Sequence, residues 1–200
     1  RLFIVGIGPL GGGWGAKSTE DGVSVTVCIN DGDTHNSPTE QLESKYPVLV
    51  ESYSIREDSS GAGRQRGGLG AEMVVQALSP FSVTTRIDRV HCKPWGLEGG
   101  GEAAGNGIAI RKKGEWDSSM PNAKIFNVRL ARGDAYKMQS GGGGGFGLPV
   151  ERDAALVAHD VREGYVSKDV ASKVYGVAMT SAGEVDEPAT ASLRKNLAKA

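Results

Sequence analysis

Glycine is the feature that most constrains what this chain can fold into, since 30 of its 200 residues are glycine. Much of it falls in dense runs at 6–15, 59–70 and 141–147. Glycine adopts backbone angles that are closed to other residues. We therefore expect a tight, packed loop for the first run and a turn for the second, SSGAGRQRGGLG. For the third run, GGGGGFG, a flexible linker and a close-packed turn are both compatible with the sequence.

Short β-branched segments between the glycine runs predict a β-rich body. They are bounded by Gly, Pro, Asn or Asp, the residues that punctuate strands. Two of them, 72–78 and 82–87, meet at Ser79-Pro80, which favours a hairpin-like connection. The expected strands are 23–29, 47–55, 72–78, 82–87, 108–111, 124–130 and 135–138, with a short helix at 41–45.

Beyond the last glycine run the apolar residues follow a helical period. Asp153 and Ser167 are suited to cap two helices, and Gly164 and Gly176 to end them. The final segment is polar and rich in alanine, and we expect a frayed or partner-dependent tail. The predicted fold is α+β, with a β-rich mixed-sheet body (1–147), a helical hairpin (148–180) and a polar tail (181–200).

Composition excludes several classes of protein. The formal charge is −1, and the 23 basic residues are scattered, so nucleic-acid binding is not expected. The chain lacks an apolar run of about 18 residues, which argues against a membrane span. Cys28 and Cys92 lack metal-site spacing and indicate free thiols in a reducing compartment, with the cytoplasm as the default. An apolar, strand-like start at Arg1 leads us to expect a fragment of a larger protein.

Two segments imitate nucleotide-binding motifs. GGGWGAKS nearly matches a phosphate-binding loop, but Ala16 occupies the position of the final glycine and a turn follows instead of a helix. GAGRQRGG imitates a dinucleotide fingerprint with the wrong spacing and no βαβ context. Structural loops are the favoured interpretation of both. Arg64 and Arg66 in the second segment are nevertheless candidates to clamp a carboxylate or phosphate.

The polar loop after 23–29 carries the strongest candidate site. Asp31, Asp33, His35 and Glu40 fall within ten residues, and carboxylates with an imidazole hold a divalent metal or move protons. Loops held by rigid scaffolds often carry such sites. The alternative interpretation is structural: Asp31 starts a turn, Asp33 or Thr34 serves as a capping residue, and His35 is exposed to solvent.

Two other histidines offer less. His91 and Cys92 are neighbours, which point in opposite directions on an extended chain and so do not form a catalytic pair. His159 has no second ligand nearby on its predicted helix and is assigned no site.

Six segments together resemble the carboxy-terminal half of the B-type proteins of the hydantoinase/oxoprolinase family. Each is weak alone, but they occur in register between about residues 6 and 177. They are GGGWGAKSTEDG, CINDGDTHNSPTEQLESKYPVLVE, SSGAGRQRGGLG, RVHCKPWGLEGG, GGGGGFGLPVERD and VREGYVSKDVASKVYGV.

This resemblance implies an enzyme of two parts, in which an A-type protein uses ATP and Mg and a B-type protein completes the reaction on a cyclic amide. Relatives carboxylate ketones such as acetone and acetophenone. In both reactions the substrate oxygen is thought to be phosphorylated first. The family's metal ligands lie in the amino-terminal half of the B-type protein, which has no counterpart here, so no metal or other cofactor is expected on this chain alone.

The resemblance leads to three hypotheses: a module of an ATP-dependent cyclic-amide hydrolase, a module of an ATP-dependent ketone carboxylase, or a non-catalytic scaffold. The expected partners are the A-type protein, the remaining part of the B-type protein and a small-molecule substrate. Relatives vary around the NSPTE-like core, which indicates contacts that depend on the substrate. The predicted catalytic residues are Asp33 and His35, and the predicted substrate-binding residues are Asp31, Asn36, Arg64 and Arg66.

Overall fold

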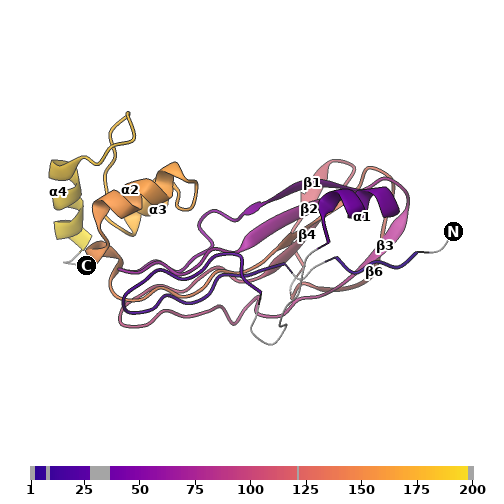
Figure 1. Ribbon diagram of the computed structural model, residues 1–200, viewed down its shortest axis with the longest axis horizontal. Helices are drawn as coiled ribbons and strands as arrows, with labels where there is room; N and C mark the ends of the chain where they lie inside the picture. Colours follow the sequence, from indigo (N-terminus) through magenta and orange to yellow (C-terminus); the bar gives the residue numbers. More distant parts are fainter. Residues whose placement is uncertain (1–2, 8–9, 28–36, 121, 198–200) are drawn as a thin grey trace.

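The computed structural model describes residues 3–7, 10–27, 37–120 and 122–197. The molecule is elongated (Figure 1). Its β-sheets lie toward one end, glycine-rich extended segments run through the middle, and three helices gather at the other end. The α+β class predicted from the sequence is confirmed.

The larger sheet has five antiparallel strands in the order β1-β2-β7-β4-β5. Its core face carries Val, Ile, Met and Tyr side chains at alternate positions, as the period of two requires. Its outer face carries a network of charged and amide side chains, Glu51 with Gln76 and Arg111, and Glu72 with Lys137. The strands are β1 (Val48–Ile55), β2 (Ala71–Ala77), β7 (Ala135–Gln139), β4 (Gly107–Lys112) and β5 (Glu115–Asp117).

The smaller sheet pairs β3 (Phe81–Arg86) with β6 (Lys124–Leu130). The main core forms between the two sheets, and helix α1 (Thr39–Lys45) adds Leu42 to its edge. Burial of this apolar surface is the main term that stabilises the body. The buried members are Val48, Val75, Ala77, Val83, Ile108, Ile110, Ala123, Ile125, Leu130 and Tyr136.

Two strand predictions are wrong. Segment 23–27 is not a strand, because its backbone bonds go to glycine-rich segments, with Val25 N–H donating to the Leu69 carbonyl and Thr26 bridging Gly12. Strands β2 and β3 do not form a hairpin, because Ser79-Pro80 carries the chain from one sheet to the other. The remaining predicted strands, and the short helix before β1, are found close to their expected bounds.

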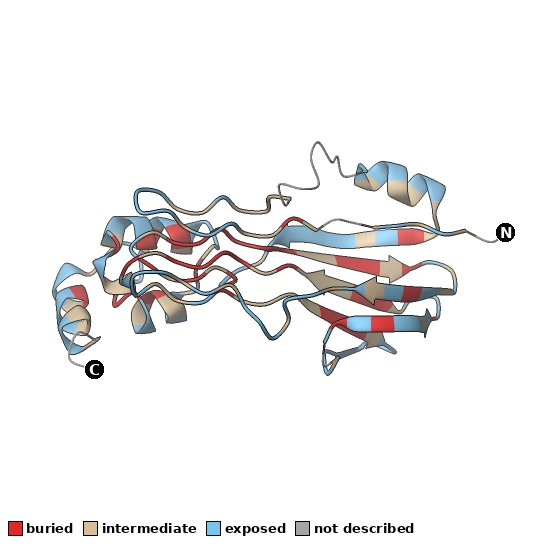
Figure 2. Cartoon of the chain, turned by 90° about the horizontal axis from the view of Figure 1, so that it is seen from below, coloured by how far each residue is buried: buried red, intermediate tan, exposed pale blue. Residues whose placement is uncertain are grey.

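Four glycine-rich segments, 11–15, 59–70, 94–105 and 140–147, lie side by side with segment 22–26. We call these five segments the glycine bundle. Backbone hydrogen bonds join them in several directions. The Gly143 N–H donates to the Gly68 carbonyl at 2.9 Å, and the Gly143 carbonyl accepts from the Gly61 N–H at 2.8 Å. Figure 2 shows long stretches of the bundle buried although they form no regular strand.

Glycine is required in the bundle because the backbones touch. A Cβ atom on Gly143 would lie 1.9 Å from the Trp14 carbonyl oxygen, and one on Gly67 would lie 1.8 Å from the Gly143 oxygen. The collagen triple helix uses glycine for the same reason at its crowded axis. The run GGGGGFG is therefore the packed centre of the bundle, and the linker interpretation is wrong.

The helical hairpin is confirmed. It consists of α2 (Ala154–Arg162) and α3 (Lys168–Lys173), and Asp153 and Ser167 accept the capping hydrogen bonds from Ala155 N–H and Val170 N–H. Gly164 and Gly176 follow the two helices with φ of 71° and 65°, the left-handed conformation that glycine adopts without strain. None of the helices described combines the length and hydrophobicity of a membrane span.

The predicted tail contains a further helix, α4 (Glu187–Leu197). Its Arg194 donates to the carbonyl oxygens of Arg152 and Tyr175, at 2.5 and 3.3 Å. Thr190 on the same helix is buried. The sequence did not predict α4 because it has only two leucines at a helical interval, and contacts with preceding segments hold it.

Four charged residues connect the glycine bundle to the helices. Arg152 donates to both oxygens of Asp21 and also contacts Asp160 at 2.9 Å. Arg66 contacts the same Asp160 oxygen at 3.3 Å, and its backbone N–H donates to Asp21. Two positive and two negative charges are thus paired in one cluster, which is how buried charges are tolerated.

Candidate functional site

A pocket of about 910 Å³ lies between the glycine bundle and the end of β3. The backbones of 12–15 and 141–144 form one side. The end of β3 and the segment after it, 84–89, form another. Since β3 belongs to the small sheet and the bundle is locked by its own hydrogen bonds, both sides are held by rigid parts of the fold.

Two tryptophans line this pocket, Trp14 and Trp95. Their backbones are fixed, because the Trp14 carbonyl packs on Gly143 and the Trp95 carbonyl packs on Gly144. Their side chains are nevertheless 43% and 71% exposed. Two exposed indoles on fixed backbone thus line the pocket, where an aromatic or apolar ligand surface finds ready partners.

Asn106 organises the pocket. Its side-chain oxygen accepts from Gly141 N–H at 2.5 Å, and its amide nitrogen donates to the Asp88 carbonyl at 2.8 Å. Its backbone N–H donates to the Arg89 carbonyl at 3.2 Å. Asn106 thus ties the backbone at Asp88 and Arg89 to Gly141 in the glycine bundle.

The charged residues among the described lining are Arg86, Asp88 and Arg89. Asp88 is paired with Lys124 at 2.6 Å. The hydrogen bond and charge of Lys124, together with the charge of Arg86, hold the pKa of this carboxyl below its ordinary value. The two guanidiniums leave the pocket with a net positive charge.

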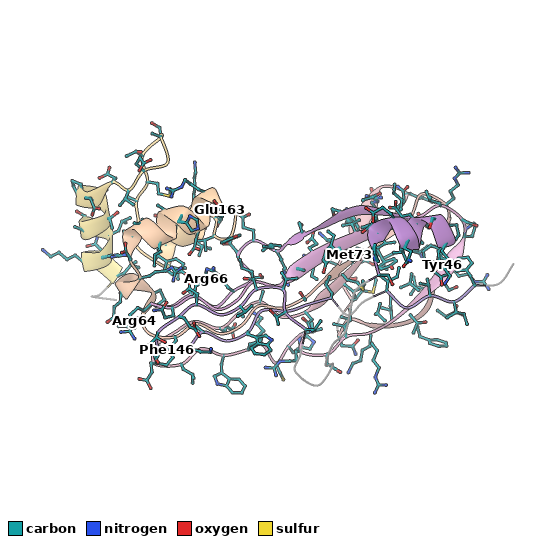
Figure 3. The ribbon with its side chains drawn as sticks, viewed as in Figure 1. Tyr46, Arg64, Arg66, Met73, Phe146 and Glu163 are labelled. Carbon is teal, nitrogen blue, oxygen red and sulfur yellow. The ribbon has the colours of Figure 1, made fainter. Side chains whose placement is uncertain are left out.

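The structure does not bring Arg64 and Arg66 to this pocket. Both lie at the helical end of the bundle, near Phe146 (Figure 3). Arg66 is buried, its guanidinium engaged with Asp160, the Gly67 carbonyl and the ring of Tyr165. Arg64 is exposed and its Nη2 donates to the Ser18 carbonyl at 3.4 Å. Their predicted substrate contacts stay a prediction.

The other predicted site residues, Asp31, Asp33, His35 and Asn36, lie outside the described residues. Val27, the last described residue before them, lines the pocket. Within the part of the chain that the structure describes, no group of three His, Cys, Asp or Glu side chains is arranged to hold a metal ion. In the segment that imitates a phosphate-binding loop, Lys17 pairs with Glu20 and no helix follows.

Sequence reasoning missed the residues that shape the pocket. Trp95 lies in RVHCKPWGL, where the sequence indicates a structural role, and Asn106 has no motif around it. The one usable signal is the pairing of a large aromatic residue with each of two glycine segments, at Trp14 and Trp95. Arg86 and Arg89 carry no local signal, because their placement depends on the pairing of β3 with β6.

Comparison with known proteins gives the family. The model of the hydantoinase B/oxoprolinase family matches residues 3–149, most of this chain. The chain belongs to this family. The B-type component of a D-/L-hydantoinase from Pseudomonas sp. strain NS671 is 30% identical over 92% of this chain and 31% of its own length. The beta component of the caprolactamase from Pseudomonas jessenii is 33% identical over 89% and 31%.

Solved structures agree with this family assignment. The ATP-dependent caprolactamase of Pseudomonas jessenii matches with a TM-score of 0.77 and 28% identity, over 92% of this chain and 32% of that one. Nucleotide-free acetone carboxylase matches with a TM-score of 0.76 and 27% identity, over 95% and 30%. The chain therefore spans about a third of the length of these hydantoinase B relatives.

Proposed function

We propose that this chain is the carboxy-terminal part of a B-type protein in an ATP-dependent hydrolase of cyclic amides. The observation that carries the proposal is the match to caprolactamase, which extends over 92% of the chain at a TM-score of 0.77. Relatives named hydantoinase and 5-oxoprolinase support the same reaction class. The chain works with an A-type partner and the rest of the B-type protein, in the cytoplasm, where its exposed thiol at Cys92 stays reduced.

The chemistry explains why such an enzyme needs ATP. An amide carbonyl is a poor electrophile, and transfer of a phosphoryl group from ATP to its oxygen, with ATP and Mg bound by the A-type partner, makes the carbonyl carbon more electrophilic. One water then adds to this carbon and the C–N bond of the ring breaks, and a second water releases the phosphate, so that a lactam, ATP and two waters give the amino acid, ADP and phosphate. We place a divalent metal on the remaining part of the B-type protein, where the family resemblance puts the metal ligands.

We place the contribution of this chain at the pocket and at the loop that follows Val27. His35 acts as the proton-transfer group or as a ligand, and Asp33 orients its imidazole. Asp31 and Asn36 contact the substrate, and the exposed Arg64 is a further substrate contact. We assign Arg66 to the ion cluster instead, because its guanidinium already has buried partners.

His35→Gln and Asp33→Asn test this assignment in the full complex. Each is expected to lower kcat by about 10²–10⁴-fold, the usual contribution of a positioned acid or base. His159→Gln is the matched control, because His159 is an exposed histidine on α2. Unchanged turnover in both variants with normal assembly would remove the site and favour a scaffold role for this chain.

Ketone carboxylation is the second candidate, favoured by the match to acetone carboxylase over 95% of the chain. The two reactions differ in their use of bicarbonate. A complex that incorporates labelled bicarbonate into product with ATP is a carboxylase, and one that opens a lactam without incorporating label is a hydrolase. We expect ring opening without incorporation.

A further inference from the structure

We infer that four exposed apolar side chains on the glycine bundle form a docking surface for the remaining part of the B-type protein. They are Trp14, Trp95, Leu97 and Leu148, and we call them the apolar strip. The inference rests on the proposed function for the identity of this partner. It adds the surface through which the chain joins the partner, and the chemistry of the face that covers it.

The apolar strip combines large side chains with high exposure. Trp95 is 71% exposed, Leu97 56%, Leu148 48% and Trp14 43%. A single exposed apolar residue is common on a soluble protein, whereas several gathered together mark an interaction surface. Tryptophan is also among the residues on which binding energy concentrates in protein interfaces. Exposure of this kind therefore points to a protein partner.

The four residues lie on adjoining parts of the molecule. Trp14 and Trp95 line the same pocket. Leu97 follows Trp95 by two residues along the same segment. The turn after Leu97 reaches Leu148, because a Cβ atom on Gly99 would lie 2.7 Å from the Leu148 Cδ2. The apolar strip thus runs from the pocket to the start of the helical region.

Fixed backbone presents Leu97 to solvent. Its N–H donates to the Gly145 carbonyl at 2.9 Å, and its carbonyl accepts from Gly147 N–H at 3.0 Å and from Gly100 N–H at 2.9 Å. The last bond closes a tight turn in which Glu98 has a φ of 51°, a conformation that a residue with a side chain adopts at a free-energy penalty. Because this backbone is already ordered, a partner that covers Leu97 need not order it first.

Salt bridges within the chain neutralise the lysines beside the two tryptophans. Lys17 pairs with Glu20 at 2.5 Å, and Lys93 pairs with Glu102 at 3.2 Å. Partners that meet by diffusion commonly use complementary charges to steer their encounter. Permanent interfaces are more hydrophobic and resemble a domain core cut in two. The apolar strip therefore fits an uncharged, apolar face of a partner that stays attached to this chain.

The relatives contain such a partner. The hydantoinase and caprolactamase relatives extend well beyond this chain, which aligns with 31% of the length of each. In the caprolactamase structure the shared fold covers 92% of this chain and 32% of that one, so most of that protein lies outside the shared fold. These relatives thus carry this module and the remaining part of the B-type protein in one polypeptide, which is the permanent attachment that an apolar interface needs.

Docking at the apolar strip also affects the pocket, because Trp14 and Trp95 line it and are exposed. A partner seated on the strip covers both indoles and closes this side of the pocket. Exclusion of water strengthens the electrostatic interactions inside a site. The second face thus completes a pocket that this chain alone leaves open.

Photo-cross-linking in the assembled complex identifies what covers the apolar strip. The photoreactive residue p-benzoylphenylalanine replaces Leu97, and mass spectrometry locates the peptide that it captures. Leu78 is the matched control position: it is a leucine directly after β2, 41% exposed, whose N–H is bonded to the Pro47 carbonyl. We expect position 97 to cross-link to a peptide of the remaining part of the B-type protein, and position 78 not to do so.

Leu97→Asp places a charge in the apolar strip and leaves the backbone hydrogen bonds of this residue intact. We titrate the variant onto the other components of the complex without ATP or substrate. It should bind at least about tenfold more weakly than the parent chain, because burial of the new carboxylate opposes docking. Leu78→Asp should bind as the parent does. Circular dichroism of the free variants checks that both remain folded.

A cross-link from position 97 to the A-type partner or to a second copy of this chain, or no cross-link at all, would overturn the inference. Binding of Leu97→Asp as tight as that of the parent would do the same. Neither readout uses turnover, so the proposed function fails separately. A complex that docks through the apolar strip but opens no lactam rejects the proposed function and leaves the docking surface. A complex that opens lactams while its Leu97→Asp variant assembles normally does the reverse.

Discussion

Arg152 donates hydrogen bonds from its two terminal nitrogens to both carboxylate oxygens of Asp21, each at 2.7 Å, across 131 residues of sequence. The Arg152 side chain is 1% exposed. This bidentate pair joins the start of the helical region to the glycine bundle, and Asp160 and Arg66 complete the cluster. These charged side chains, together with Ala62 packed against the apolar cluster of the helices, hold the helices against the bundle.

Arg152→Met is expected to lower the free energy of unfolding by about 3–5 kcal/mol, because it leaves the buried Asp160 without its nearest cation. Urea unfolding followed by circular dichroism measures the change. Lys173→Met serves as the control: Lys173 pairs with Asp169 on the surface of α3, and an exposed pair of this kind contributes about 0.5 kcal/mol. Equal effects of the two substitutions would contradict the structural role of the cluster.

Acid should weaken this same connection. Burial raises the pKa of Asp21, but the hydrogen bond and charge of Arg152, together with Arg66, outweigh burial and hold the pKa below the ordinary value of 3.8. A lowered folded-state pKa adds stability that is complete above the unfolded-state pKa and is lost as the pH falls through the folded-state pKa. We therefore expect the free energy of unfolding to fall below about pH 4, and Asp21→Asn to flatten that part of the profile. An Asp21→Asn profile that matches the parent would exclude Asp21 as the titrating group.

Gly143→Ala should disrupt the fold, because its Cβ would lie 1.9 Å from the Trp14 carbonyl oxygen and 2.5 Å from Gly15 N, both backbone atoms that cannot move aside. We expect a loss of at least about 3 kcal/mol. Gly6→Ala is the control, since no atom of the described residues lies within 4 Å of a Cβ at that position. Thermal unfolding of the two variants compares them directly, and equal melting temperatures would mean that the bundle is not packed as described.

Asn106→Leu removes the acceptor for Gly141 N–H and the donor for the Asp88 carbonyl. The part-buried Gly141 N–H left without its acceptor costs about 1–3 kcal/mol, whereas the exposed Asp88 carbonyl is free to bond to water. The local prediction is sharper: amide hydrogen exchange at Gly141 should accelerate, while that of Val75 in the sheet core changes only by the global loss of stability. An unchanged exchange rate of the Gly141 amide would show that Asn106 does not tie the backbone at Asp88 and Arg89 to Gly141.

The sequence predicted the parts of the fold that local signals control. The helical hairpin was correct because Asp153 and Ser167 bond their own first turns, and Gly164 and Gly176 supply the left-handed ends. Strand β1 was also correct: Val48 is buried and Val50 partly buried at alternate positions, while its other residues are exposed. In each case the residues that decide the structure lie within the element itself.

The errors arose where distant residues decide. Val25 has a strand-forming side chain but lies in the glycine bundle, because its backbone N–H donates to the Leu69 carbonyl there. Arg66 looked like a free cation until the fold placed Asp160, 94 residues away, beside it. The pocket at Trp14, Trp95 and Asn106 was missed for the same reason, since segments far apart in the sequence build it. Pairing over such distances cannot be read from any one segment of the sequence.

The most direct test of the account is the stoichiometry of ATP use in the reconstituted complex. The A-type partner and the rest of the B-type protein are assayed with and without this chain, and ADP and ring-opened product are measured on a panel of lactams and hydantoins. We predict one ADP per ring opened with the chain present, and no ring opening without it. Ring opening at the full rate by the remaining proteins, or by this chain alone, would contradict the claim that this module completes a shared catalytic centre.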